Sequence, residues 1–303
     1  MNAETISNTA SISERARRPA GSKRRPARLT RTLARNLLRA AERISPALAA
    51  WLLYQMARHP PKRRVDGATE EVLSRARHGV VRFGAHNVRT YTWGDHGPTV
   101  LCVHGWGGLA AQMTPFVAPL LDAGFRVVAF DAPAHGATGG RGSDPMEFSR
   151  SIAAVARSIG PVHAVISHSL GAATTLLAAR DGSLRPLRLV LLSGYASLDL
   201  VMDQMRGMFR VSVPVLKRTW ERFCGVYGHR SDHEELSPLA SLRALDCSTF
   251  ILHDQDDAIV PISHSEELLA AARSGSIVRT RGLGHHSILN SEVGRWCAEF
   301  ISR

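Results

Sequence analysis

The sequence lacks the features that mark several classes of protein. No two of its cysteines form a C-x-x-C pair, which argues against a disulfide framework or a cysteine-bound zinc ion; they are Cys102, Cys224, Cys247 and Cys297. No apolar run reaches the ~18 residues that span a bilayer, and residues 1–28 contain no apolar core of a secretory signal. No metal-ligand spacing such as H-E-x-x-H occurs. We therefore expect a cytoplasmic protein with reduced thiols, no metal and no organic cofactor.

Acidic residues are scarce in the first part of the chain, and the positive charge is concentrated there. The net charge is +12, and residues 1–90 hold 19 of the 38 basic residues but only 6 of the 26 acidic ones. The remainder of the chain is close to neutral. A nucleic-acid-binding domain carries its basic patch on the folded body, so we expect no specific nucleic-acid partner. Residues 1–28 are polar and basic, with little to bury, and are predicted to form a disordered tail.

Residues 29–78 are predicted to form a helical extension. Leucines recur at helical spacing between arginines over residues 29–44. A second helix is expected from Pro46 to Ala57, because proline is accepted in the first turn of a helix but not in its middle. Two interpretations stay open. The helices pack on the surface of the domain, or they form a basic amphipathic anchor that contacts an anionic membrane, as in a peripheral membrane protein.

From residue 79 to residue 303, short strands alternate with helices, which predicts an α/β fold with a mainly parallel sheet. Strands are expected over residues 80–83, 88–93, 99–104, 125–130, 162–166, 187–193, 247–253 and 276–280, the first two as an antiparallel hairpin. Helices are expected over residues 112–123, 145–159, 172–180, 265–273 and 291–301. An insert over about residues 194–245, rich in methionine and aromatic residues, is predicted to form a small apolar cap over the carboxyl edge of the sheet.

One strand breaks directly into a helix at a serine. Residues 167–171 read Ser-His-Ser-Leu-Gly, the pattern of a nucleophile elbow, which holds a serine hydroxyl at a strained apex. Ser169 is therefore the candidate nucleophile. The pattern expects glycine at position 167, where Ser167 is small enough to be tolerated; Ser167 as the nucleophile would instead put Ser169 in the tight position. A serine hydroxyl needs a base, a group that orients the base, and donors for the oxyanion.

Two later segments offer the acid and the base in the chain order Ser, acid, His. Residues 253–261 read His-Asp-Gln-Asp-Asp-Ala-Ile-Val-Pro, and residues 282–286 read Gly-Leu-Gly-His-His. Here the chain resembles the α/β-hydrolase family, whose H-G-x-x-D-x-x-V-P and G-x-G-H segments align with these two. It is similar to bacterial serine hydrolases that carry a basic helical N-terminal extension. The resemblance implies an α/β-hydrolase fold: a mainly parallel eight-stranded sheet flanked by helices, with a small helical cap.

The resemblance also implies a role for each matching residue. Asp257 would orient His285, with Asp256 as the alternative acid. Asp254, where the family has glycine, and Asp256 would be surface carboxylates or supports of the loop, and His286 would point away. The backbone N–H groups of Trp106 and Leu170 would form the oxyanion hole. Residues 131–136, Asp-Ala-Pro-Ala-His-Gly, match a further family segment, and Asp131 and His135 are assigned a structural role.

These residues predict a serine hydrolase that cleaves a carboxylic ester, or a related acyl bond, through a Ser-Asp-His triad and an acyl-enzyme. The partner is a small-molecule acyl substrate. Thioesterase, lipase and amidase activities stay open, because a fold does not determine the substrate. The rival hypothesis is a catalytically inactive protein of the same fold that binds a ligand and attaches to a membrane surface by its basic N-terminus.

Overall fold

The computed structural model describes residues 25–63, 65–180, 182–226 and 236–303. Most of the predicted basic tail lies outside the described residues. The first helix, α1, spans Arg25–Ile44 and so begins earlier than the predicted boundary at residue 29.

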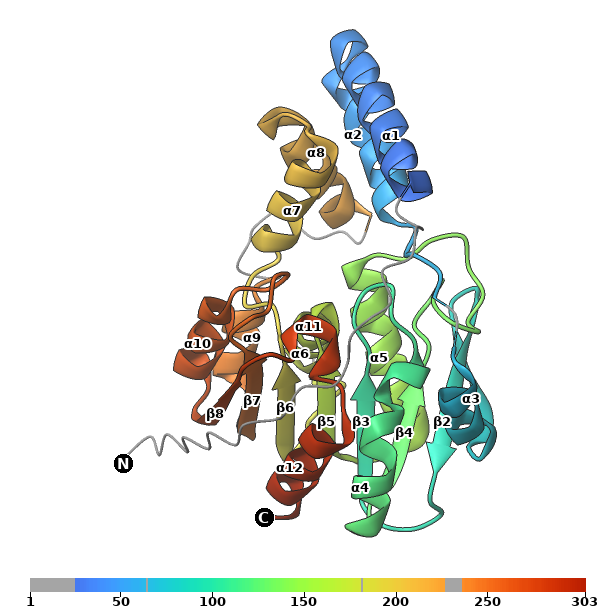
Figure 1. The fold of residues 1–303 in the computed structure, drawn as a ribbon, viewed down its shortest axis with the longest axis vertical. Coiled ribbons are helices and arrows are strands. Elements are labelled where there is room, and N and C mark those ends of the chain that lie inside the picture. The colour runs from blue at the N-terminus through green and yellow to red at the C-terminus, as the bar shows by residue number, and fades with distance from the viewer. Residues whose placement is uncertain (1–24, 64, 181, 227–235) are drawn as a thin grey trace.

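Eight strands form a single sheet in the described part of the chain (Figure 1). Their order is β1-β2-β4-β3-β5-β6-β7-β8; β2 is antiparallel to β1 and β4, and the neighbouring pairs from β4 to β8 are parallel. The strands are β1 Arg77–Phe83, β2 His86–Trp93, β3 Thr99–Val103, β4 Arg126–Phe130, β5 Val162–His168, β6 Arg188–Leu192, β7 Ser248–Asp254 and β8 Ser274–Thr280. The predicted mainly parallel sheet with an antiparallel entry hairpin is confirmed.

Helices cover both faces of the sheet (Figure 1). One face holds α3 Gly67–Ser74, the 3₁₀ helix η1 Ala110–Phe116, α4 Val117–Asp122 and α12 Ser291–Ser302. The other holds α5 Pro145–Ile159, α6 Leu170–Arg180, α9 Pro238–Ala244 and α10 Ile262–Ala271. Each face buries its own apolar core, because the central strands are apolar on both sides.

The single helix predicted over residues 112–123 is wrong in one respect. The segment begins as η1 and becomes the α-helix α4 only at Val117. Pro115 lies inside the first part and has no N–H to donate to an α-helical hydrogen bond. The tighter 3₁₀ turn accommodates this proline.

The two N-terminal helices pack on the insert rather than on the sheet. Ser45 caps α2, which spans Pro46–Ala57, and the pair α1–α2 lies against α7 Asp199–Phe209 and α8 Val213–Gly225. Their shared core includes the fully buried Leu38, Leu53 and Val215. We call these four helices the helical lobe. In Figure 1 the lobe lies above the carboxyl-terminal ends of the strands, where β6 leads into α7.

This packing divides the apolar residues of the insert between two neighbours. Met205 and Phe209 face the N-terminal helices, whereas Val201 and Trp220 pack toward the hydrolase body. The prediction that the methionine and aromatic residues of the insert together form a cap over the sheet is therefore wrong for Met205 and Phe209.

Among the described residues, no helix is both long and apolar enough to cross a membrane. All four cysteines are buried and unpaired.

Candidate active site

Ser169 lies at a sharp turn between the end of β5 and the start of α6. Its backbone φ is 58°, in the left-handed region that non-glycine residues rarely adopt. Its backbone N–H donates to the carbonyl of Leu192 on β6 at 2.9 Å, which fixes the turn to the sheet. A side chain at Gly171 would collide with the carbonyl oxygen of His104. This collision explains why the residue two positions after Ser169 is glycine. It also explains why the elbow pattern fits this segment with Ser169, and not Ser167, at the apex.

The loop after β3 comes equally close to Ser169. A Cβ atom at Gly105 would lie 2.9 Å from the Cβ of Ser169, so only glycine fits there. Ser167 lies within the sheet, fully buried, and its hydroxyl donates to the carbonyl of Val190 at 3.3 Å. Ser167 therefore fits at the position where the elbow pattern expects glycine, and its hydroxyl points toward β6.

The structure brings Ser169, His285 and Asp257 together. Nε2 of His285 lies 2.8 Å from Oγ of Ser169, and its Nδ1 lies 2.7 Å from Oδ2 of Asp257. The other oxygen of Asp257 accepts the backbone N–H groups of Ile259 and Val260 at 2.8 and 2.9 Å. Burial alone would raise the pKa of Asp257, but the hydrogen bond from His285 and those backbone bonds outweigh it and hold the pKa well below its usual range. Asp257 is therefore an ionised partner for the imidazole.

The other two carboxylates of this loop have different positions. Asp256 is exposed and accepts the N–H of Gly282 at 3.0 Å, without contact to His285. Asp254 is fully buried. The prediction that it is a surface carboxylate is therefore wrong, and the alternative prediction, that it supports the loop, is the one that agrees with its position. Its carboxylate accepts the hydroxyl of Thr280 at 2.8 Å and the N–H of Leu283 at 3.0 Å. Asp254 thus ties the acid loop to the segment that carries the histidine.

His285 lies on one turn of helix, α11 Gly284–Ser287. The ring of His168, buried directly before Ser169, donates from Nε2 to the backbone oxygen of His285 at 2.8 Å. His168 therefore positions His285 relative to the elbow. Sequence reasoning missed this role, although His168 directly precedes Ser169 in the sequence. His286 is exposed, and its Nε2 lies 3.4 Å from the guanidinium of Arg63.

The predicted oxyanion donors belong to the residue after Ser169 and to the loop after β3. Among the described residues, neither the backbone N–H of Trp106 nor that of Leu170 has a hydrogen-bond partner. The loop that carries Trp106 is held by two buried side chains. Nε2 of His135 accepts the N–H of Gly107 at 3.0 Å, and Asp131 accepts the N–H of Ala110 at 2.7 Å. These contacts agree with the structural roles predicted for Asp131 and His135.

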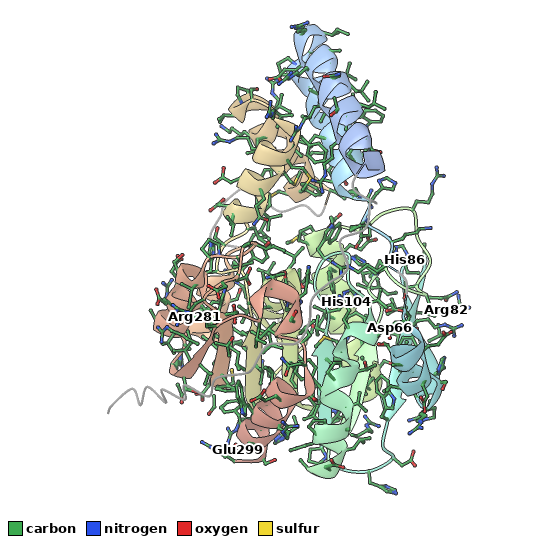
Figure 2. The ribbon with its side chains drawn as sticks, in the orientation of Figure 1. Asp66, Arg82, His86, His104, Arg281 and Glu299 are labelled. Atoms are coloured by element: carbon green, nitrogen blue, oxygen red, sulfur yellow. The ribbon has the colours of Figure 1, made fainter. Side chains whose placement is uncertain are left out.

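Three neutral histidines are packed around the elbow and its adjoining loops. His104 lies in the interior, at the end of β3 (Figure 2). Burial lowers the pKa of His104 to about 4, and burial together with a neighbouring imidazole lowers the pKa of His135 and that of His168 to about 3. Each ring is therefore uncharged in the folded state at neutral pH.

These histidines predict that the protein loses stability as the pH falls. Their folded pKa values lie below the unfolded value of about 6.5, so the unfolded state binds more protons between about pH 6.5 and pH 4. With three such groups, the free energy of unfolding should fall by up to about 4 kcal/mol per pH unit near pH 5. Urea unfolding followed by circular dichroism at pH 7 and pH 5 measures this change. Equal stability at the two pH values would contradict the buried, neutral state.

One group among the described residues could gather around a metal ion, namely His168, His285 and His286. Their ring nitrogens do not fit a ready-made site. Both ring nitrogens of His285 are engaged by Ser169 and Asp257, and Nε2 of His168 donates to a carbonyl oxygen. A metal ion bound here would have to break the Ser169–His285 or the His285–Asp257 contact.

Comparison with known proteins agrees with this geometry. A family model described as "Alpha/beta hydrolase family" matches residues 100–300. A non-heme haloperoxidase of Rhodococcus erythropolis is 27% identical, over 58% of this chain and 80% of its own length. An esterase from Pyrococcus furiosus aligns with a TM-score of 0.60 at 20% identity, over 80% of this chain and 98% of the esterase.

A membrane phospholipase A described as a bacterial virulence factor aligns with a TM-score of 0.58 at 18% identity. The alignment covers 91% of this chain and 98% of that one. The likeness in fold thus extends beyond the hydrolase body into the N-terminal helices.

Proposed function

The chain belongs to the alpha/beta hydrolase family of hydrolytic enzymes, and we propose that it is a serine hydrolase cleaving a carboxylic ester or a related acyl bond. The observation that supports this proposal is the unbroken chain of hydrogen bonds from Ser169 through His285 to Asp257. Each of the three groups has the partner that its chemical role requires.

In the proposed mechanism, Oγ of Ser169 attacks the substrate carbonyl while Nε2 of His285 takes the hydroxyl proton. The carboxylate of Asp257 holds the imidazole by Nδ1 and stabilises the imidazolium that forms. The backbone N–H groups of Trp106 and Leu170 donate to the oxyanion. His285 then gives its proton to the leaving alcohol, and an acyl group remains on Ser169. A water molecule, activated by His285, releases the acid and regenerates the serine.

The surroundings of Ser169 favour an apolar acyl group. Leu170 belongs to a buried apolar cluster that also contains Tyr195, Leu198 and Val260, with Trp106 packed against it. Such side chains bind hydrocarbon by removing it from water and offer few polar partners to a charged acyl chain. Proteins of similar fold include an esterase, a lipase and a thioesterase, and we expect a hydrophobic ester to be the preferred substrate.

The rival hypothesis of an inactive binding protein is less well supported. A protein that has lost catalysis has no reason to keep a buried serine, histidine and carboxylate within hydrogen-bonding distance. A cytoplasmic location remains a prediction.

The proposal predicts that a fluorophosphonate probe labels Ser169 and that the protein hydrolyses p-nitrophenyl esters. A panel of acyl lengths, with matched thioesters and anilides, measures the preferred bond and chain. The apolar cluster predicts that medium acyl chains react faster than acetate. The Ser167→Ala variant serves as control, because Ser167 is a buried serine two residues away and should leave labelling unchanged. Absence of both labelling and turnover over the whole panel would overturn the proposed function.

A further inference from the structure

Both N-terminal helices carry large apolar side chains that the described part of the chain leaves exposed to a large extent. Leu33, Leu37 and Ile44 on α1 are 61%, 53% and 78% exposed, and Leu48 and Trp51 on α2 are 39% and 43% exposed. The spacings of four and seven residues place the three α1 side chains on one side of the helix. We call these five residues the outer apolar row.

The outer apolar row is separate from the stripe that holds the helical lobe together. Leu38 and Ala41 of α1 are buried against the other helices of the lobe, at 0% and 5% exposure. On a helix Leu38 lies about 100° around the axis from Leu37 and about 120° from Ile44, and Ala41 lies between the two sides. The side of α1 centred on Leu38 therefore packs on the lobe, and the neighbouring side, which carries Leu33, Leu37 and Ile44, faces outward.

Arginines lie along the remaining side of α1. Arg31, Arg35, Arg39 and Arg43 recur every four residues, and Arg35 is held in place by donating from Nε to the carbonyl of Met208 at 2.8 Å. Residues 30–57, which carry the row, contain these four arginines and a single acidic residue, Glu42. The apolar row thus lies on a helix pair with a net positive charge.

We propose that this face of α1 and α2 is a docking surface for an anionic lipid membrane. Apolar side chains beside arginines suit the boundary between acyl chains and negatively charged headgroups, where the apolar face of a helix is buried and its basic residues meet phosphate. Charge argues against a second copy as the occupant, because two such faces would repel one another. Residues 1–24 are poorly suited to cover this face, because their only large apolar side chains are Met1, Ile6 and Ile12.

The docking face is connected directly to the candidate active site. Residues 58–63 leave the end of α2 and run across the loop that carries Trp106, where a side chain at Gly107 would collide with Pro61. The guanidinium of Arg63 reaches His286, next to the catalytic base. A membrane bound to α1 and α2 would therefore hold the hydrolase body in a defined orientation.

The test uses the full chain and sedimentation with vesicles. We expect binding to phosphatidylcholine vesicles that contain about one third phosphatidylglycerol, and at least about tenfold weaker binding to pure phosphatidylcholine. The double variant Leu37→Glu/Ile44→Glu should weaken binding to the anionic vesicles by about tenfold or more. Leu187→Glu is the matched control, because Leu187 is 60% exposed but lies just before β6, outside the lobe. Thermal unfolding verifies that both variants fold.

Trp51 supplies a second, local measurement. Its fluorescence should shift to shorter wavelength when anionic vesicles are added, and the shift should be lost in Trp51→Phe. The proposal is overturned if the wild-type protein does not sediment with anionic vesicles, or if the double variant binds them as well as Leu187→Glu does. It is also overturned if light scattering without lipid shows a wild-type dimer that the double variant dissociates, because the face would then join two copies.

Discussion

Replacing Ser169 with alanine should lower kcat for ester hydrolysis by about 10⁶-fold and leave the fold intact. The loss is large because no acyl-enzyme can form without the hydroxyl that accepts the acyl group. The fold should survive because alanine tolerates the left-handed backbone of this turn; Ala134 already adopts φ 63° in this protein, close to the 58° of Ser169. Initial rates with the best p-nitrophenyl ester measure the effect.

The matched variant Ser167→Ala separates the two serines of the elbow. It should keep kcat within about threefold of wild type, because Ser167 is bonded to β6 and not to His285. The reverse pattern, with Ser169→Ala active and Ser167→Ala inactive, would show that the nucleophile has been misassigned. Thermal unfolding of both variants distinguishes lost chemistry from a lost fold.

Replacing Asp257 with asparagine should lower kcat by about 10⁴-fold with a small change in KM. Asparagine keeps the shape but removes the charge, so the imidazolium that forms during attack is no longer stabilised. Its amide can also present an N–H to Nδ1 of His285 and favour the wrong tautomer, in which Nε2 cannot accept the proton of Ser169. Steady-state kinetics on the same ester measure kcat and KM separately.

Asp256→Asn is the control for this prediction, because Asp256 is the neighbouring acid that the sequence left as an alternative. Its carboxylate contacts the N–H of Gly282 at the surface, and its replacement should change kcat by less than about tenfold. If Asp256→Asn inactivated the enzyme and Asp257→Asn did not, the orienting acid would be Asp256.

Buried polar contacts connect the segments that carry the candidate triad. Asp254 joins the acid loop to the start of the histidine segment, and His168 joins the elbow to the backbone of His285. Both groups are buried, so each hydrogen bond is protected from competition with water, and an unpaired partner would be costly. They keep the short Ser169–His285 contact in place, although the two residues are far apart in the chain.

Much of this protein is determined by the sequence near each element. Apolar runs predicted the strands of the sheet, and Pro46 after Ser45 correctly marked the start of α2. The residues of the candidate triad were found because an elbow, an acid loop and a histidine segment each have a short pattern whose geometry is local. Asp257 was preferred to Asp256 because the resemblance to the family's H-G-x-x-D-x-x-V-P segment aligns Asp257 with the orienting acid.

Only the tertiary structure decided which distant segments meet. The burial of Asp254 depends on Thr280 and Leu283, and the role of His168 depends on a residue 117 positions away. Likewise, the apolar spacing of α1 predicted a helix but not that it would pack on an insert more than 150 residues later. Propensity and spacing act over a few residues, whereas the partner of a buried group is selected when the whole core packs. The pattern of α1 alone therefore could not separate the apolar side chains used for packing from those left facing outward.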